Sequence, residues 1–77
     1  MTLDDLKPGE RACVIAVAAA GPLQQRLMQL GLIEGTEVAM VRRAPAGDPI
    51  ECTVLGYTLS LRRSEARMVE VQALAWT

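Results

Sequence analysis

The chain has 77 residues, which is enough for one small domain but not for a catalytic domain beside a separate binding domain. Eight basic and nine acidic residues give a net charge of −1, and one Trp, one Tyr and no Phe leave no base-stacking platform, so nucleic acid is a disfavoured partner. Because the chain lacks histidine and shows neither a nucleophile–base pair nor a phosphate-binding loop, we expect neither an enzyme nor a resident cofactor.

The first quarter of the chain predicts a helical turn followed by a strand. Residues 3–6 can form the turn, which Pro8-Gly9 stops. Residues 11–18 are apolar and β-branched at their centre, which predicts a strand covered on both faces, as in a small closed barrel. The bulkier face, which we expect to point into the core, consists of Cys13, Ile15 and Val17.

Residues 22–30 have the spacing of one short amphipathic helix. Gly21-Pro22 favours a helix start, and Gly31 ends the helix because glycine adopts positive φ without strain. Three leucines recur at i, i+4 and i+7, so they form one apolar stripe that packs on the strands. Met28 lies on the flank of this stripe, where core packing is favoured over a partner contact. The leucines are Leu23, Leu27 and Leu30, and the glutamines on the opposite side are Gln25 and Gln29.

The remainder of the chain predicts four more strands. Residues 37–43, 50–55 and 57–61 have strand patterns, and the Pro- and Gly-rich loop 44–49 and Gly56 separate them. Ser64 can cap a helical turn at residues 64–67, and residues 68–71 form the last strand. Together these elements predict a mainly β domain, a small five-stranded barrel with one inserted helix.

The cysteines and the N-terminus indicate a reducing compartment. Cys13 and Cys52 form no CxxC pair, so we expect them in or near the core and not as metal ligands. The first residues lack the basic and apolar regions of a signal peptide, and no apolar run approaches the ~20 residues that cross a bilayer. We therefore expect a cytoplasmic protein without direct membrane insertion.

Several segments, in their order and spacing, resemble the FeoA (ferrous iron transport protein A) family. They are Leu3-Asp4-Asp5-Leu6-Lys7-Pro8-Gly9, Arg26-Leu27-Met28-Gln29-Leu30-Gly31-Leu32-Ile33-Glu34-Gly35-Thr36, Ala44-Pro45-Ala46-Gly47-Asp48-Pro49, Gly56, Leu59-Ser60-Leu61-Arg62, Ala66 and Val69-Glu70-Val71. The resemblance covers residues 3–72 and implies one SH3-like barrel domain over residues 1–77, with a loose tail at residues 73–77.

The resemblance also implies a function and a partner. Members of the family act beside FeoB, a membrane ferrous-iron permease with a cytoplasmic GTP-binding domain. We therefore expect a cytoplasmic accessory protein that binds the permease and modulates uptake. Two alternatives stay open: a metal-responsive regulatory domain, and a GTPase-activating partner that supplies Arg26 or Arg43 as an arginine finger.

Two segments are candidates for the contact with this partner. Arg26 has the planar donor fork typical of interface anchors, although a local ion pair over the barrel is an equally good interpretation. The loop 44–49 presents an exposed Asp48, although its prolines also stabilise a long hairpin tip. The candidate partner-binding residues are Gln25, Arg26, Met28, Gln29, Pro45, Gly47, Asp48 and Pro49. The glycines expected in structural turns are Gly31, Gly35 and Gly56.

Other charged and aromatic residues have more than one interpretation. Arg42-Arg43 and Arg62-Arg63-Arg67 form a basic edge if their strands are neighbours, and a solvated strand end is favoured over an anion contact. Trp76 is either frayed or packed on an apolar patch, and the chain allows a weak homo-oligomer. The surface carboxylates that could bind a divalent cation weakly are Asp4, Asp5, Glu34, Glu37 and Glu51.

Overall fold

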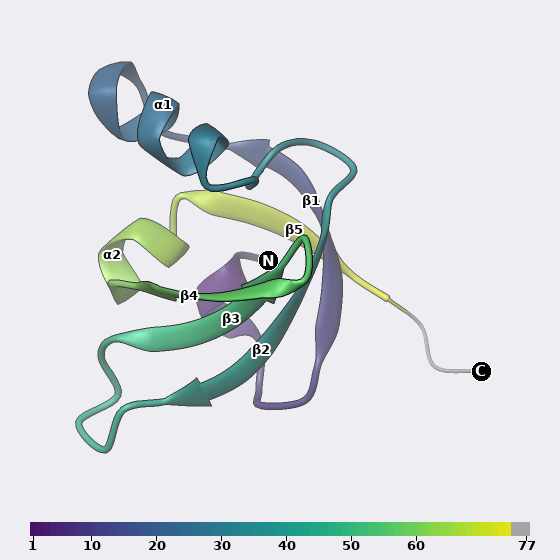
Figure 1. Cartoon of the computed structure of the whole chain (residues 1–77), viewed down its shortest axis with the longest axis vertical. Helices are drawn as coiled ribbons and strands as arrows, with labels where there is room; N and C mark the ends of the chain where they lie inside the picture. Colours follow the sequence, from purple (N-terminus) through teal and green to yellow (C-terminus); the bar gives the residue numbers. More distant parts are fainter. Residues whose placement is uncertain (75–77) are drawn as a thin grey trace.

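The computed structural model describes residues 1–74, which contain five strands and three short helical segments (Figure 1). Every predicted element is present, and its ends lie within two residues of the expected positions. None of the helices in residues 1–74 has the length and apolar character needed to span a bilayer. The elements are the 3₁₀ helix η1 (Leu3–Asp5), β1 (Arg11–Val17), α1 (Gly21–Gln29), β2 (Glu37–Arg43), β3 (Ile50–Val54), β4 (Tyr57–Leu61), α2 (Arg63–Ala66) and β5 (Val69–Ala73).

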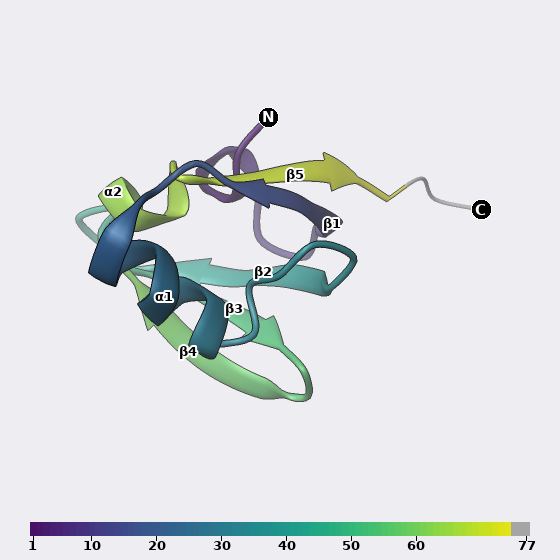
Figure 2. The ribbon, with the colours of Figure 1, turned by 90° about the horizontal axis from the view of Figure 1, so that it is seen from above.

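The five strands form one antiparallel sheet in the order β4-β3-β2-β1-β5. The prediction of a closed barrel was wrong, because β4 and β5 do not pair within the described chain (Figure 2). The start of the chain occupies part of the outer edge of β5 instead. Thr2 bridges Glu70, and the Val71 N–H donates to the Met1 carbonyl at 3.0 Å. The sheet is therefore open between β4 and β5, which α2 connects along the chain.

Four leucines from outside the strands contribute to the core. Leu3 and Leu6 come from the N-terminal turn, and Leu27 and Leu32 come from α1 and the segment after it; each is at most 1% exposed. Ala66 of α2 and the inward-facing strand residues complete the core; the strand residues are Ala12, Val14, Val38, Met40, Ile50, Cys52, Val54, Leu59, Leu61, Val69 and Val71.

The expected orientation of β1 was wrong. Ala12 and Val14 are buried, whereas Ile15 is 40% exposed and Cys13 and Val17 are only half-buried. Ala12 and Val14 pack in one buried cluster with Leu3 of η1 and Leu27 of α1, so the strand presents its smaller side chains to a core that already holds these leucines. A register shift against β5 between Val14 and Ala16 also breaks the regular alternation of faces.

The helix α1 packs by its leucine stripe and ends at a required glycine. Leu27 is buried, and Leu23 and Leu30 are packed partly against the core. Gly31 has φ +100, and a Cβ at this position would lie 2.7 Å from Cδ1 of Leu55. Met28 is 47% exposed, so the expectation that it packs in the core was wrong.

Candidate partner-binding surface

The short helix α2 contacts both segments that were predicted to bind a partner. The Arg26 guanidinium of α1 forms an ion pair with the Glu65 carboxylate of α2. From the loop 44–49, Asp48 Oδ1 accepts a hydrogen bond from the Arg63 N–H at 3.1 Å. α1 and this loop are therefore linked through α2.

The contact from Asp48 changes the cap expected for α2. Ser64 lies inside the helix, the N-cap position is Arg62, and the expected Ser64 cap was wrong. Asp48 satisfies the first helical N–H from another segment, and the Glu65 carboxylate accepts from the Arg62 N–H at 3.0 Å. The Asp48 side chain is thus exposed to solvent but already bound to the fold.

The pKa of Glu65 reflects this position between two basic groups. Partial burial by itself raises the pKa of the Glu65 carboxyl, but the Arg62 N–H and the Arg26 guanidinium outweigh this effect. The net pKa is lowered below its usual 4.5, so the carboxylate is charged at neutral pH.

A groove of about 680 Å³ lies where α1, α2, β4 and the loop 44–49 come together. Of the predicted binding residues, only Arg26 and Pro49 line it. The sequence interpretation missed its other residues, although Ser60 and Arg62 belong to a segment that carries the family resemblance. The groove residues are Leu23, Arg26, Pro49, Ser60, Arg62, Ser64 and Glu65.

The other predicted residues on α1 lie outside this groove. Successive residues of an α-helix are about 100° apart, so Met28 lies roughly 200° around the axis from Arg26. Gln25, Met28 and Gln29 are exposed, and the groove lining contains none of them. On the loop, Pro45 is exposed and Gly47 lies beside the Arg63 side chain. The predicted surface is therefore divided between at least two faces.

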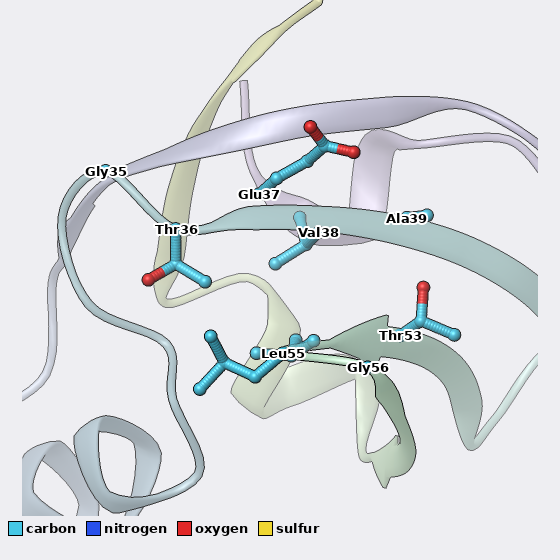
Figure 3. Close-up of a pocket in the computed structure, with 9 residues that line it drawn as sticks. Gly35, Thr36, Glu37, Val38, Ala39, Thr53, Leu55 and Gly56 are labelled. Atoms are coloured by element: carbon cyan, nitrogen blue, oxygen red, sulfur yellow. The ribbon is translucent and has the colours of Figure 1, made fainter.

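A second groove, of about 600 Å³, lies between the start of β2 and the β3–β4 turn (Figure 3). Thr36 and Leu55 extend into the same space, whereas the Glu37 carboxylate points away from it. Gly35 and Gly56, both in turns with positive φ, form part of the lining. The only ionisable side chain in the lining is Glu37, which pairs with Arg11 at 3.2 Å. This groove thus has no group of converging charges.

The buried Asp4 carboxylate collects three arginines that are distant in the sequence. Arg43 Nη1 lies 2.8 Å from Oδ1, Arg63 Nε lies 3.2 Å from Oδ1, and Arg67 Nε lies 3.3 Å from Oδ2. Arg43 also donates to the carbonyl oxygens of Asp4 and Leu6. We call Asp4, Arg43, Arg63 and Arg67 the Asp4 cluster.

The Asp4 cluster corrects two sequence interpretations. Asp4 was expected as an exposed carboxylate for a divalent cation, but it is 8% exposed and bonded to arginines. Burial by itself raises the pKa of Asp4. The hydrogen bonds from Arg43, Arg63 and Arg67 outweigh this effect, so the net pKa lies below 3.8. Three arginines of the expected basic edge, Arg43, Arg63 and Arg67, therefore pair with a buried carboxylate.

The remaining ionisable residues show no group of metal ligands. Within residues 1–74, no three Cys, Asp or Glu side chains are arranged to hold a metal ion. Cys13 and Cys52 are both free thiols, and burial raises the pKa of Cys52 to about 11. Glu51 pairs with Arg42 at 3.0 Å. Trp76, whose packing was left open, lies outside the described residues.

The chain is similar to known proteins over nearly all of its length. The sequence profile described as "FeoA domain" matches residues 1–73. A fusion protein of Fe(2+) transport protein A and Fe(2+) transporter FeoB from Porphyromonas gingivalis is 31% identical over 75 residues. That match covers 97% of this chain but only 9% of the fusion protein, so the chain corresponds to a small part of that relative.

Two solved structures are similar to this chain in both sequence and fold. The FeoA protein of Chlorobium tepidum is 47% identical with a TM-score of 0.91, covering 97% of this chain and 71% of that one. The FeoA protein of Stenotrophomonas maltophilia, described as an SH3 domain protein in complex with zinc, is 36% identical with a TM-score of 0.83, covering 94% and 89%. The open five-stranded sheet is therefore an SH3-like fold, and the chain belongs to the FeoA family, which is associated with ferrous iron transport.

Proposed function

We propose that this chain is a cytoplasmic accessory protein of ferrous iron transport that binds the cytoplasmic part of a FeoB-type permease and modulates uptake. The observation that carries the proposal is the Porphyromonas gingivalis relative, in which transport protein A and the transporter FeoB form one polypeptide. Fusion keeps two domains at a high effective concentration, whereas a separate chain must reach the permease through a binding surface of its own.

The groove formed by α1, α2, β4 and Pro49 is the surface we assign to this contact. It combines the half-buried Leu23 with Arg26 and Arg62, so apolar and basic groups lie side by side. Arginine beside a small apolar surface is typical of protein interfaces. Modulation requires that the chain bind one conformation of the permease more tightly than another, because equal affinity for both shifts nothing.

The arginine-finger alternative has weaker support from the geometry. A finger must leave its own surface and reach a nucleotide on the partner. Arg43 is held by Asp4 and by the carbonyl of Leu6, and Arg26 pairs with Glu65. Both guanidiniums would have to break these contacts first. The other alternative, a metal-responsive role, is supported by one observation, which is that the Stenotrophomonas maltophilia protein was solved in complex with zinc.

Calorimetric titration of the chain into the purified cytoplasmic domains of the permease tests the proposal. We expect saturable binding by the wild-type chain and a weakening of about tenfold for Arg26→Ala, since loss of one good interfacial contact changes the binding free energy by about 1.4 kcal/mol. Arg42→Ala is the matched control, because Arg42 also forms one exposed ion pair but does not line the groove. If the wild-type chain does not bind, the proposed function is contradicted. If Arg26→Ala and Arg42→Ala lose affinity equally, the assigned surface is contradicted.

A further inference from the structure

We propose that the outer edge of β4 pairs with an extended, acidic segment of the partner, which adds a sixth strand to the sheet at its open side. This inference deepens the proposed function and rests on it. Three observations carry it: the direction of the backbone groups of β4, the absence of edge protection, and the charge of the adjacent groove.

The register of the β3–β4 hairpin decides which backbone groups of β4 point outward. A two-residue turn, Leu55-Gly56, joins the paired residues Val54 and Tyr57. In an antiparallel pair, hydrogen-bonded and non-hydrogen-bonded positions alternate from the turn onward. Thr58 and Ser60 therefore occupy non-hydrogen-bonded positions, and their N–H and C=O groups point away from β3.

These outward groups have no partner in the described chain. Thr58 and Ser60 are both exposed, and no backbone group from another described segment bonds to either residue. The opposite edge of the sheet differs, because Met1 and Thr2 already pair with part of β5. The edge that remains available over successive residues is that of β4.

The sequence of β4 also lacks the usual features that prevent edge pairing. Exposed edge strands are commonly protected by charged side chains, proline or a bulge. The strand Tyr57–Leu61 contains no charge and no proline, and its pairing with β3 is regular along its whole length. The start of the strand is tied to the end of α1, because the Tyr57 hydroxyl donates to the Leu30 carbonyl. From Thr58 onward the edge has the features that favour strand addition by an extended peptide.

The groove beside this edge indicates the chemistry of the added segment. Ser60 of β4 lines it together with Leu23, Arg26 and Arg62, so a segment paired with β4 would pass these side chains. Arg26 and Arg62 face one carboxylate, Glu65, and the Arg62 guanidinium forms no ion pair within residues 1–74. The local excess of positive charge favours an acidic segment, although the whole chain has a net charge of −1.

Two variants at one residue separate backbone pairing from side-chain contact. Ser60→Pro removes the outward N–H but none of the bonds to β3, and proline is tolerated at such an edge position. Ser60→Ala keeps the N–H and removes only the hydroxyl. The probe is the purified cytoplasmic domain of the permease, and the readouts are its affinity by calorimetry and the amide exchange of Thr58 and Ser60 by NMR.

We expect Ser60→Pro to weaken binding by about tenfold or more and Ser60→Ala by less than about threefold, with the Thr58 and Ser60 amides protected in the wild-type complex. Wild-type binding with an unaffected Ser60→Pro variant and unprotected amides overturns the inference alone. No wild-type binding overturns the proposed function and the inference with it. If the Thr58 and Ser60 amides become protected as the concentration of this chain rises without the permease domain, the edge pairs with a second copy of the chain. That result overturns the proposed partner.

Discussion

The Asp4 carboxylate accepts a hydrogen bond from Arg43 Nη1 at 2.8 Å, although 39 positions separate the two residues in the chain. Asp4 lies in η1 at the N-terminus, and Arg43 is the last residue of β2. Arg63 and Arg67 reach the same carboxylate from α2 and the residue after it. One buried charge thus joins the beginning, the middle and the end of the described chain.

Removing the charge of Asp4 is expected to destabilise the fold. Asp4→Asn leaves Arg43, Arg63 and Arg67 close together without their shared counter-charge. We expect the free energy of unfolding to fall by about 2 kcal/mol, less than for a fully buried pair because the arginines remain partly hydrated. Chemical denaturation measures this change.

Glu51→Gln is the matched control for this prediction. It also removes one carboxylate that pairs with an arginine, but Glu51 and Arg42 lie on the surface. We expect its denaturation midpoint to equal that of the wild type, because exposed ion pairs contribute little. Equal midpoints for Asp4→Asn and the wild type would show that the Asp4 cluster does not stabilise the fold.

The stability of the protein should also fall in acid. Asp4 and Glu65 have pKa values lowered from 3.8 and 4.5, so their folded forms bind protons more weakly than the unfolded chain does. Their contribution is fully present above these usual values and disappears as the pH falls through the lower, folded values. We expect a stable plateau near neutral pH and a decline below about pH 4. A shallower decline in Asp4→Asn, followed by circular dichroism, supports the assignment; an unchanged slope contradicts it.

Gly31→Ala is expected to cost more stability than Gly9→Ala. Both glycines have positive φ, +100 and +90, so alanine is strained at either position. A Cβ at Gly9 meets nothing within 4 Å, whereas a Cβ at Gly31 meets Leu55 at 2.7 Å and Val54 at 3.0 Å. We expect losses of about 1 kcal/mol for Gly9→Ala and about 2 kcal/mol for Gly31→Ala.

A double variant tests the reason for that difference. In a Leu55→Ala background, Gly31→Ala should cost less than in the wild type, because the closest side-chain atom is gone. Thermal denaturation of the four proteins gives the coupling. Additive losses would mean that backbone conformation alone accounts for the requirement for glycine.

The two cysteines should differ in reactivity. Cys52 is buried and its pKa is raised to about 11, so at pH 8 only about one thousandth of it is thiolate. Cys13 is half-buried on the outer face of β1. We expect a thiol reagent to modify one residue per native chain quickly, and Cys13→Ser to abolish that fast phase. A fast phase of the same size in Cys13→Ser would contradict the burial of Cys52.

Local sequence features predicted the elements, because their signals lie within a few residues. Gly31 ends α1, the loop 44–49 joins two strands, and the leucine spacing of residues 22–30 defines a helix. The orientation of β1 was not predictable in this way. Its inward residues, Ala12 and Val14, pack in one cluster with Leu3 and Leu27 from outside the strand, so the orientation is a property of the assembled fold.

The candidate site was less predictable for a related reason. The separation of Arg26 from Met28 follows from helical geometry and could have been read from the sequence. Arg26 lines one groove with Pro49, Ser60 and Arg62 because of where α2 packs. The sequence of a helix of only four residues does not indicate that position. The Asp4 cluster likewise joins residues whose proximity no local pattern signals.

Ferrous iron uptake in cells that retain the permease but lack this chain tests the proposed function most directly. We expect that uptake is altered in these cells and that the wild-type chain and Ser60→Ala restore it. Ser60→Pro, present at the same level, should not restore it. Uptake that is the same with and without the chain, at several external iron concentrations, would contradict the proposal that this protein regulates the permease.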